Sequence, residues 1–174
     1  MNFQFYYEKL AYSQAYKDFM EKNPKAYLCS CLFILDREHS GKDNKIHFDF
    51  WLPEKKKMAS FRVDGKVEFM DVEHFEKKVF EKVSTDYTFD IEHFEEMIFK
   101  KMSEEKVNGR IQKLLFSLQR LDGKDFLIMT GFLSNLGLLK ANISLEEDKI
   151  ILLEKKSFFD MMRVVKKKDL PKKD

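Results

Sequence analysis

Thiols and an imidazole lie close together in the first third of the chain. Cys29 and Cys31 are two positions apart, and His47 lies on a stretch that we expect to be the next strand. Side chains two apart on a strand point to the same face, so a Cys/Cys/His cluster is conceivable. Structural zinc takes four ligands, and neither a fourth ligand nor CxxC or HxxxH spacing is present. We therefore interpret the cysteines as buried core residues and expect no metal site.

Two further histidines stand in similar EHFE contexts. His74 lies within Glu73–Glu76 and His93 within Glu92–Glu95. Histidine beside glutamate could act as an acid–base pair, but such charged stretches are typical of solvated helix faces. The sequence contains no nucleophile elbow, phosphate loop, dinucleotide fingerprint or zinc-protease motif. It indicates no catalytic residue and no cofactor, and it favours a non-enzymatic protein.

The candidate binding residues share one face of a predicted strand. Residues 45–52 alternate, so that His47, Asp49 and Trp51 lie opposite the apolar side chains of the same stretch. Tryptophan is enriched at interfaces, which makes Trp51 a candidate contact residue if that face is exposed. If a helix covers the face, Trp51 is a core residue.

A second candidate surface is the basic C-terminal tail, residues 163–174. Clustered lysines can bind nucleic-acid phosphates or an acidic partner. No aromatic residue interleaves with them to stack on bases, so a solvated end is the favoured interpretation. The lysines concerned are Lys166, Lys167, Lys168, Lys172 and Lys173.

Composition limits the class of protein. The chain has 174 residues, 44% of them apolar, and 18 are phenylalanine, so a sizeable core is expected and wholesale disorder is excluded. The 32 basic and 30 acidic side chains nearly cancel, which gives no global attraction to nucleic acid. No secretory signal is visible and the apolar runs are too short to span a membrane. We expect a cytoplasmic protein without membrane contact.

Periodicity predicts the elements of the first half. Helical spacing indicates a helix over residues 4–22, or a shorter one capped by Ser13, and Asn23-Pro24 ends it. Alternation predicts strands over 26–36, 45–52 and 58–63. The first of these is apolar on both faces, which is typical of a central strand. Pro53 takes the second position of the turn between the other two.

The second half begins with Asp90, which we expect to cap a helix of about fifteen residues ended by Asn108-Gly109. Residues 111–121 are ambiguous, because their local periodicity favours a helix whereas Asp122-Gly123 favours a hairpin. Phe158 and Phe159 are expected to fold back on the sheet. Three more strands are predicted, over 126–132, 137–144 and 149–154.

Each half therefore contains a helix followed by a meander, which predicts an α+β fold of two helix-plus-antiparallel-meander units. The units are residues 1–65 and 90–162, in one compact body. A connector, residues 66–89, joins them. In it Val67 and Phe69 could extend a strand, and 72–83 could form a short helix.

The stretch Asn23-Pro24-Lys25-Ala26-Tyr27-Leu28, after a short helix, resembles the opening of a group of small uncharacterised archaeal proteins. Those proteins also have an aromatic strand before a turn that is similar to Phe50-Trp51-Leu52-Pro53. The second half, at Leu138–Ser144, Lys149–Leu153 and Ser157–Met161, is similar to a PepSY-type module, with one helix on a strand meander as in cystatin-like folds.

This resemblance implies that residues 111–121 are a strand. The chain departs from the PepSY pattern at Leu145-Glu146-Glu147-Asp148, where an Asp…Gly turn is usual. The archaeal group provides no activity to transfer, and secreted PepSY modules are associated with inhibiting or chaperoning peptidases.

The expected function is a non-enzymatic intracellular module that holds a peptide or protein partner on a sheet face or edge. Two alternatives stay open. One is a nucleic-acid or ribosome-associated protein acting through the lysine tail. The other is a small-ligand or enzymatic role in a phenylalanine-lined cavity.

Overall fold

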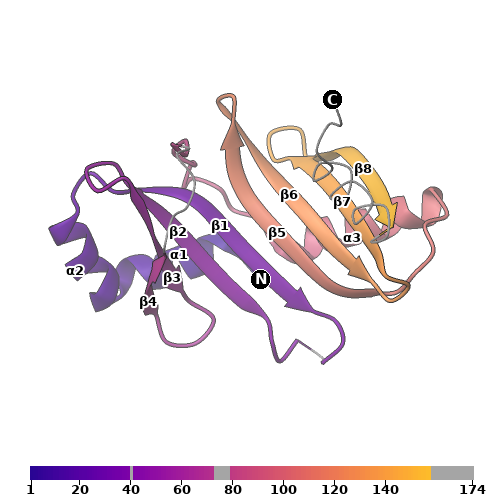
Figure 1. Ribbon diagram of the computed structural model, residues 1–174, viewed down its shortest axis with the longest axis horizontal. Coiled ribbons are helices and arrows are strands. Elements are labelled where there is room, and N and C mark those ends of the chain that lie inside the picture. The colour runs from indigo at the N-terminus through magenta and orange to yellow at the C-terminus, as the bar shows by residue number, and fades with distance from the viewer. Residues whose placement is uncertain (40, 73–78, 158–174) are drawn as a thin grey trace, which may run out of the picture.

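The computed structural model describes residues 1–39, 41–72 and 79–157 (Figure 1). Within these residues it has three helices and eight strands, all strands belonging to one antiparallel sheet. The predicted α+β class is therefore confirmed. The elements are α1 Phe3–Tyr12, α2 Gln14–Lys22, β1 Tyr27–Asp36, β2 Lys45–Leu52, β3 Lys57–Arg62, β4 Glu68–Val72, α3 Ile91–Glu104, β5 Ile111–Leu121, β6 Lys124–Leu133, β7 Gly137–Ser144 and β8 Lys149–Ser157.

The strand order is β4-β3-β2-β1-β5-β6-β7-β8. Each half of the chain runs outward from its own first strand, and β1 and β5 pair at the centre, with Phe33 opposite Phe116. The central position predicted for residues 26–36 and the strand predicted for 111–121 are both confirmed. Long-range pairing thus overrides the helical periodicity of β5, because its Leu114, Phe116 and Leu118 all enter the core.

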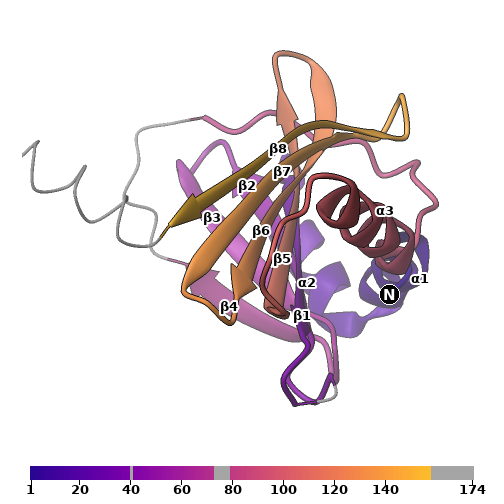
Figure 2. The same ribbon diagram turned by 90° about the vertical axis from the view of Figure 1, so that its right-hand side faces the viewer.

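The three helices cover the same face of the sheet, as Figure 2 shows. The sheet side chains that point toward them are almost completely buried, and phenylalanines of the sheet and the helices form much of this core. Aromatic pairs at 4.5–7 Å stabilise such a core beyond their buried area. Ring centroids are 5.8 Å apart for Phe3 and Phe48, 5.8 Å for Phe19 and Phe50, and 5.5 Å for Phe89 and Phe94.

Ser13 divides the predicted helix 4–22 into α1 and α2. Its backbone is extended, with φ −71° and ψ 145°. Its hydroxyl donates to the Leu10 carbonyl at 2.7 Å and accepts from the Tyr16 amide at 3.2 Å, so one residue caps both helix ends. The alternative of a shorter helix capped by Ser13 and ending at Lys22 is confirmed, with α1 in addition.

The predicted end of α3 at Asn108-Gly109 is wrong by four residues. The helix ends at Glu104, where the Lys106 amide donates to the Ser103 carbonyl and the Val107 amide to the Met102 carbonyl. This is the Schellman pattern, in which the residue after the cap takes a left-handed conformation. Here that residue is Lys106, with φ +52°, and not a glycine. At the other end, Asp90 occupies the N-cap position, but its side chain makes no capping hydrogen bond.

The connector contributes a strand that the sequence only hinted at. β4 pairs with β3, with Phe69 opposite Phe61, and forms one edge of the sheet. Half of the short helix suggested for 72–83 falls on residues 73–78, outside the described part of the chain. Residues 79–89 form neither helix nor strand, and the Val83 amide donates to the Leu28 carbonyl at 2.9 Å.

The hairpin turns follow from their residues. Asp122 and Gly123 both have positive φ, +51° and +75°, as a two-residue hairpin of the primed type requires. The Lys55 amide donates to the Leu52 carbonyl, which places Pro53 in the second position of its turn, as predicted. In the β7–β8 turn, where PepSY modules have glycine, Asp148 takes φ +47°.

Candidate binding surface on the outer face of the sheet

The outer face of the sheet, opposite the three helices, holds the candidate binding residues. Strand pairing aligns Ser60, Asp49, Ser30 and Gln119 in one row across β3, β2, β1 and β5. His47 lies two residues from Asp49 along β2, on the same face, and opposite Arg62. The structure therefore places His47 and Asp49 on a shared polar strip, in the centre of the outer face.

Burial is the largest cause of the pKa shifts of Asp49 and His47 in this polar strip. Burial raises the pKa of the Asp49 carboxyl, and hydrogen bonds from the Ser60 and Ser30 hydroxyls only partly offset the effect. Burial also lowers the pKa of His47, against the attraction of Asp49 and Asp64. In both groups burial shifts the pKa toward the uncharged form.

Trp51 shares this face but is a packing residue, with 4% of its surface exposed. Its ring centroid lies 5.9 Å from that of Phe80, in the connector. The Tyr27 hydroxyl donates to the Phe80 carbonyl at 2.8 Å and holds the connector against the sheet. A connector segment, and not the helix considered from the sequence, covers this end of β2.

The two cysteines do not face His47 together. Cys31 enters the helix-covered core, whereas Cys29 lies where the β1–β2 register shifts between Leu28 and Ser30. The Cys29 thiol donates to the Asp49 carbonyl at 3.3 Å, and burial, followed by the Asp49 charge, raises its pKa to about 12. Burial raises the pKa of the Cys31 thiol as well. Both thiols are unpaired and buried, as interpreted from the sequence.

An apolar groove of about 540 Å³ opens on the outer face over β5, β6 and β7. Its floor includes two cross-strand pairs of residues from β6 and β7, Phe132 with Leu138 and Thr130 with Lys140. Phe132 is 41% exposed, which is a large apolar area for a side chain on a strand. The remaining lining residues are Gln112, Leu133, Leu136 and Gly137.

The rim of this groove is held in an unusual conformation. Leu136, in the β6–β7 turn, has φ +58° and is 61% exposed. Left-handed backbone is uncommon for a large side chain and occurs more often at functional positions. The Asn135 amide group donates to the Asn108 carbonyl at 3.1 Å and fixes the turn against the loop after α3. The turn thus presents an apolar side chain to solvent at the groove.

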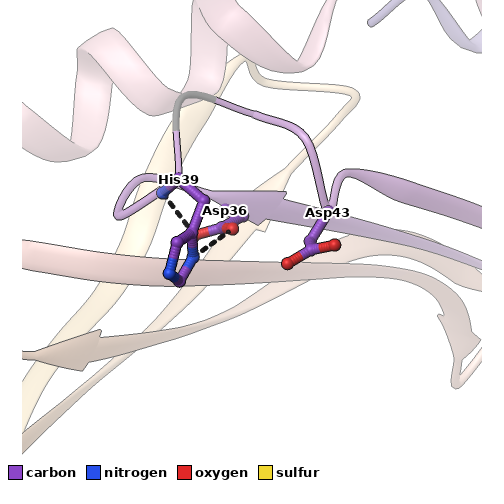
Figure 3. A group of neighbouring side chains, drawn as sticks. All are labelled: Asp36, His39 and Asp43. Atoms are coloured by element: carbon purple, nitrogen blue, oxygen red, sulfur yellow. Dashed lines mark hydrogen bonds and ion pairs between the residues drawn. The ribbon is translucent and has the colours of Figure 1, made fainter.

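A group of possible metal ligands lies at the β1–β2 hairpin (Figure 3): Asp36, His39 and Asp43, with ligand atoms within 4.8 Å of one another. Asp36 is buried, and its carboxylate accepts from the Glu38 and His39 amides and lies 2.9 Å from His39 Nδ1. Although burial opposes it, these contacts lower the pKa of Asp36. Both carboxylate oxygens therefore take part in closing the turn.

The residue that follows β1, Arg37, is tied to α3 by an ion pair with Glu95, of which only the glutamate is buried. Arg37 Nε donates to Glu95 Oε1 at 2.6 Å, and a second bond joins Arg37 Nη2 to Glu95 Oε2. The Glu95 side chain is only 8% exposed. An open groove of about 650 Å³ lies beside the pair and includes Phe99 and Arg110. Because charges of both signs line it, the groove shows no clear ligand preference.

The remaining residues considered from the sequence are His93, His74, the Phe158-Phe159 pair and the lysine tail. His93 lies 2.9 Å from Asp148 in the β7–β8 turn, a surface contact between α3 and the sheet edge. His74, the Phe158-Phe159 pair and the lysine tail lie outside the described residues. Among the described residues no helix has the length and hydropathy needed to cross a bilayer.

Sequence reasoning did not single out the apolar groove or the Asp36 group. A signal existed for the groove, because alternation in two successive predicted strands places Phe132 and Leu138 opposite their core neighbours. For the Asp36 group the signal was the spacing Asp-x-x-His-x-x-x-Asp in a polar stretch. Neither signal shows that the residues meet in space.

No protein-family model, curated protein or solved structure matches this chain. The resemblance to archaeal proteins and PepSY modules therefore stays a prediction from motifs.

Proposed function

We propose that this protein is a non-enzymatic interaction module that holds an apolar peptide segment of a partner on the outer face of its sheet. The observation behind the proposal is the apolar groove over β5–β7, which lies on the face that the helices leave uncovered. Mostly apolar concave sites with a few polar groups are the usual form of a binding site. Phe132 and Leu138 would contact apolar side chains, while Thr130, Gln112 and Lys140 would orient the backbone.

We favour the face over the edges of the sheet. The edge strand β8 carries Glu154, Lys155 and Lys156, and charged residues of this kind discourage pairing with another strand. The edge strand β4 is short, five residues, which has the same effect. The groove has a single charged residue, Lys140, and its exposed Phe132 and Leu136 would gain free energy from being covered.

As part of the same proposal, the chain is a tandem of two PepSY-like or cystatin-like units that share one sheet. Support comes from the equal order of elements in the two halves and from the pairing of their first strands, β1 and β5. We also propose a cytoplasmic location, in which free thiols such as those of Cys29 and Cys31 stay reduced.

Selection from a displayed peptide library on the immobilised chain tests the function. Enriched peptides should carry aromatic or aliphatic residues and should bind Phe132→Ser about tenfold or more weakly, since truncating a central aromatic contact commonly costs over 1 kcal/mol. Phe99→Ser is the matched control, because Phe99 is 45% exposed but lies on α3. Peptides that bind both variants equally well, or no enrichment at all, would contradict the proposal.

A further inference from the structure

The described chain ends beside the apolar groove. Ser157, the last residue of β8, is the direct partner of Gly137 in β7, and Gly137 lines the groove. The next pair in the register joins Lys156 to Leu138, the floor of the groove. Whatever follows Ser157 therefore starts within one residue of this site.

The residues that follow are strongly apolar. Six of the eight residues from 158 to 165 are Phe, Met or Val, and the remaining two are Asp160 and Arg163. A stretch of this composition gains free energy from leaving water, at roughly 25 cal/mol for each Å² of apolar surface buried. Eight residues reach about 12 Å as a helix or up to about 28 Å extended, which is ample for a site that begins one residue away.

The charges of the groove and of the segment after Ser157 are complementary. Lys140, at the groove, has no hydrogen bond or ion pair from its side chain among the described residues. Asp160 is the one acidic residue of the apolar stretch. A run of lysines begins at Lys166, so the apolar stretch ends at residue 165.

We infer that the apolar groove is the docking site of this chain's own segment 158–165. The segment covers Phe132 and Leu138, with Asp160 near Lys140, and the lysines beyond it stay in solvent. An outside peptide must then compete with the segment, and its apolar residues should be of the same kind, aromatic and methionine. The docking itself does not depend on the existence of an outside partner.

Photo-cross-linking in the full chain tests the docking without any partner. With Phe159→p-benzoylphenylalanine, irradiation should give cross-links within one copy that map to residues 130–140. The matched control, Leu170→p-benzoylphenylalanine, places the same group beyond the first lysines and should lose these cross-links. Links between two copies would assign the groove to a second copy. Links elsewhere, or none, would equally overturn the inference.

A second readout uses the dye 8-anilinonaphthalene-1-sulfonate, whose fluorescence rises on exposed apolar surface. Replacing Phe158→Ser and Phe159→Ser together should expose the groove and raise the dye signal severalfold, with the circular dichroism of the sheet unchanged. Lys167→Ser and Lys168→Ser together should leave the signal unchanged. An equal signal for wild type and the double phenylalanine variant would contradict the docking, whereas the proposed function could still be met by a groove that is open at rest.

Discussion

Arg37, the residue after β1, and Glu95, on α3, form a bidentate ion pair in which the glutamate side chain is only 8% exposed. The pair joins the first half of the chain to the helix of the second half. It therefore fixes how α3 lies over the central strands, below the surface on which we place the function.

Arg37→Met should lower the free energy of unfolding by about 1–2 kcal/mol, because it removes the partner of the buried Glu95 carboxylate, while the partly exposed arginine side of the pair limits the loss. Urea denaturation measures the loss. Adding Glu95→Leu should recover most of it, since an apolar pair removes the buried charge. Lys25→Met breaks an exposed pair with Glu54 and serves as control, with no measurable effect expected. Equal losses in the two single variants would show that the Arg37–Glu95 pair has no special role.

Lys106→Gly should stabilise the protein by about 0.5–1 kcal/mol, because glycine adopts left-handed backbone without strain. Lys106 has φ +52° in the Schellman turn after α3. The matched control is Lys100→Gly, within the same helix, which should destabilise by about 1 kcal/mol. Thermal or urea unfolding distinguishes the two signs, and a loss of stability at both positions would contradict the assigned helix end.

Much of the fold could be predicted from the sequence, because most strands show an alternating pattern and the turns carry Pro53 or Asp122-Gly123. The end of α3 could not, since a lysine fills a position where glycine is the recognisable signal. The strand β4 was only hinted at, because its side chains are mostly exposed and show no alternation. The packing of Trp51 depends on Phe80, twenty-nine residues further along the chain, and no local pattern reveals such a contact.

Asp49→Asn should change the pH dependence of stability. The folded state raises the pKa of Asp49, so it binds more protons than the unfolded state between the ordinary value, 3.8, and the raised one. The free energy of unfolding of the wild type therefore falls as pH rises through that window. The asparagine variant has no carboxyl group at this position, so its free energy of unfolding does not show this decrease. The stability of the variant relative to wild type should increase with pH and level off above the folded pKa. Urea denaturation across the acidic range, up to neutral pH, measures it.

Asp36→Asn provides a control of opposite sign. Its folded pKa lies below 3.8, so the wild-type carboxylate contributes stability that is present above that value and lost as pH falls through the folded pKa. The free energy of unfolding of the variant relative to that of the wild type should therefore decrease as pH rises from strongly acidic values. Parallel curves for the two variants would contradict the burial and hydrogen bonding assigned to these carboxylates.

Neither cysteine should react with Ellman's reagent in the native protein. A thiol pKa raised from 9.0 to about 12 lowers the reactive thiolate of Cys29 by about a thousandfold at neutral pH, and Cys31 is fully buried. Both thiols should react rapidly in denaturant. Fast reaction of one thiol under native conditions would show that the connector at Phe80 opens and exposes the start of β1.

The central claim, that the apolar groove binds peptide, is tested most directly with a fluorescein-labelled peptide of residues 157–168. The receptor is the full chain with Phe158→Ser and Phe159→Ser, and fluorescence anisotropy measures binding. We expect saturable binding that Phe132→Ser weakens about tenfold or more, as for a central aromatic contact, and that Phe99→Ser leaves unchanged. Absence of saturable binding, or equal affinity for the two variants, would contradict the claim.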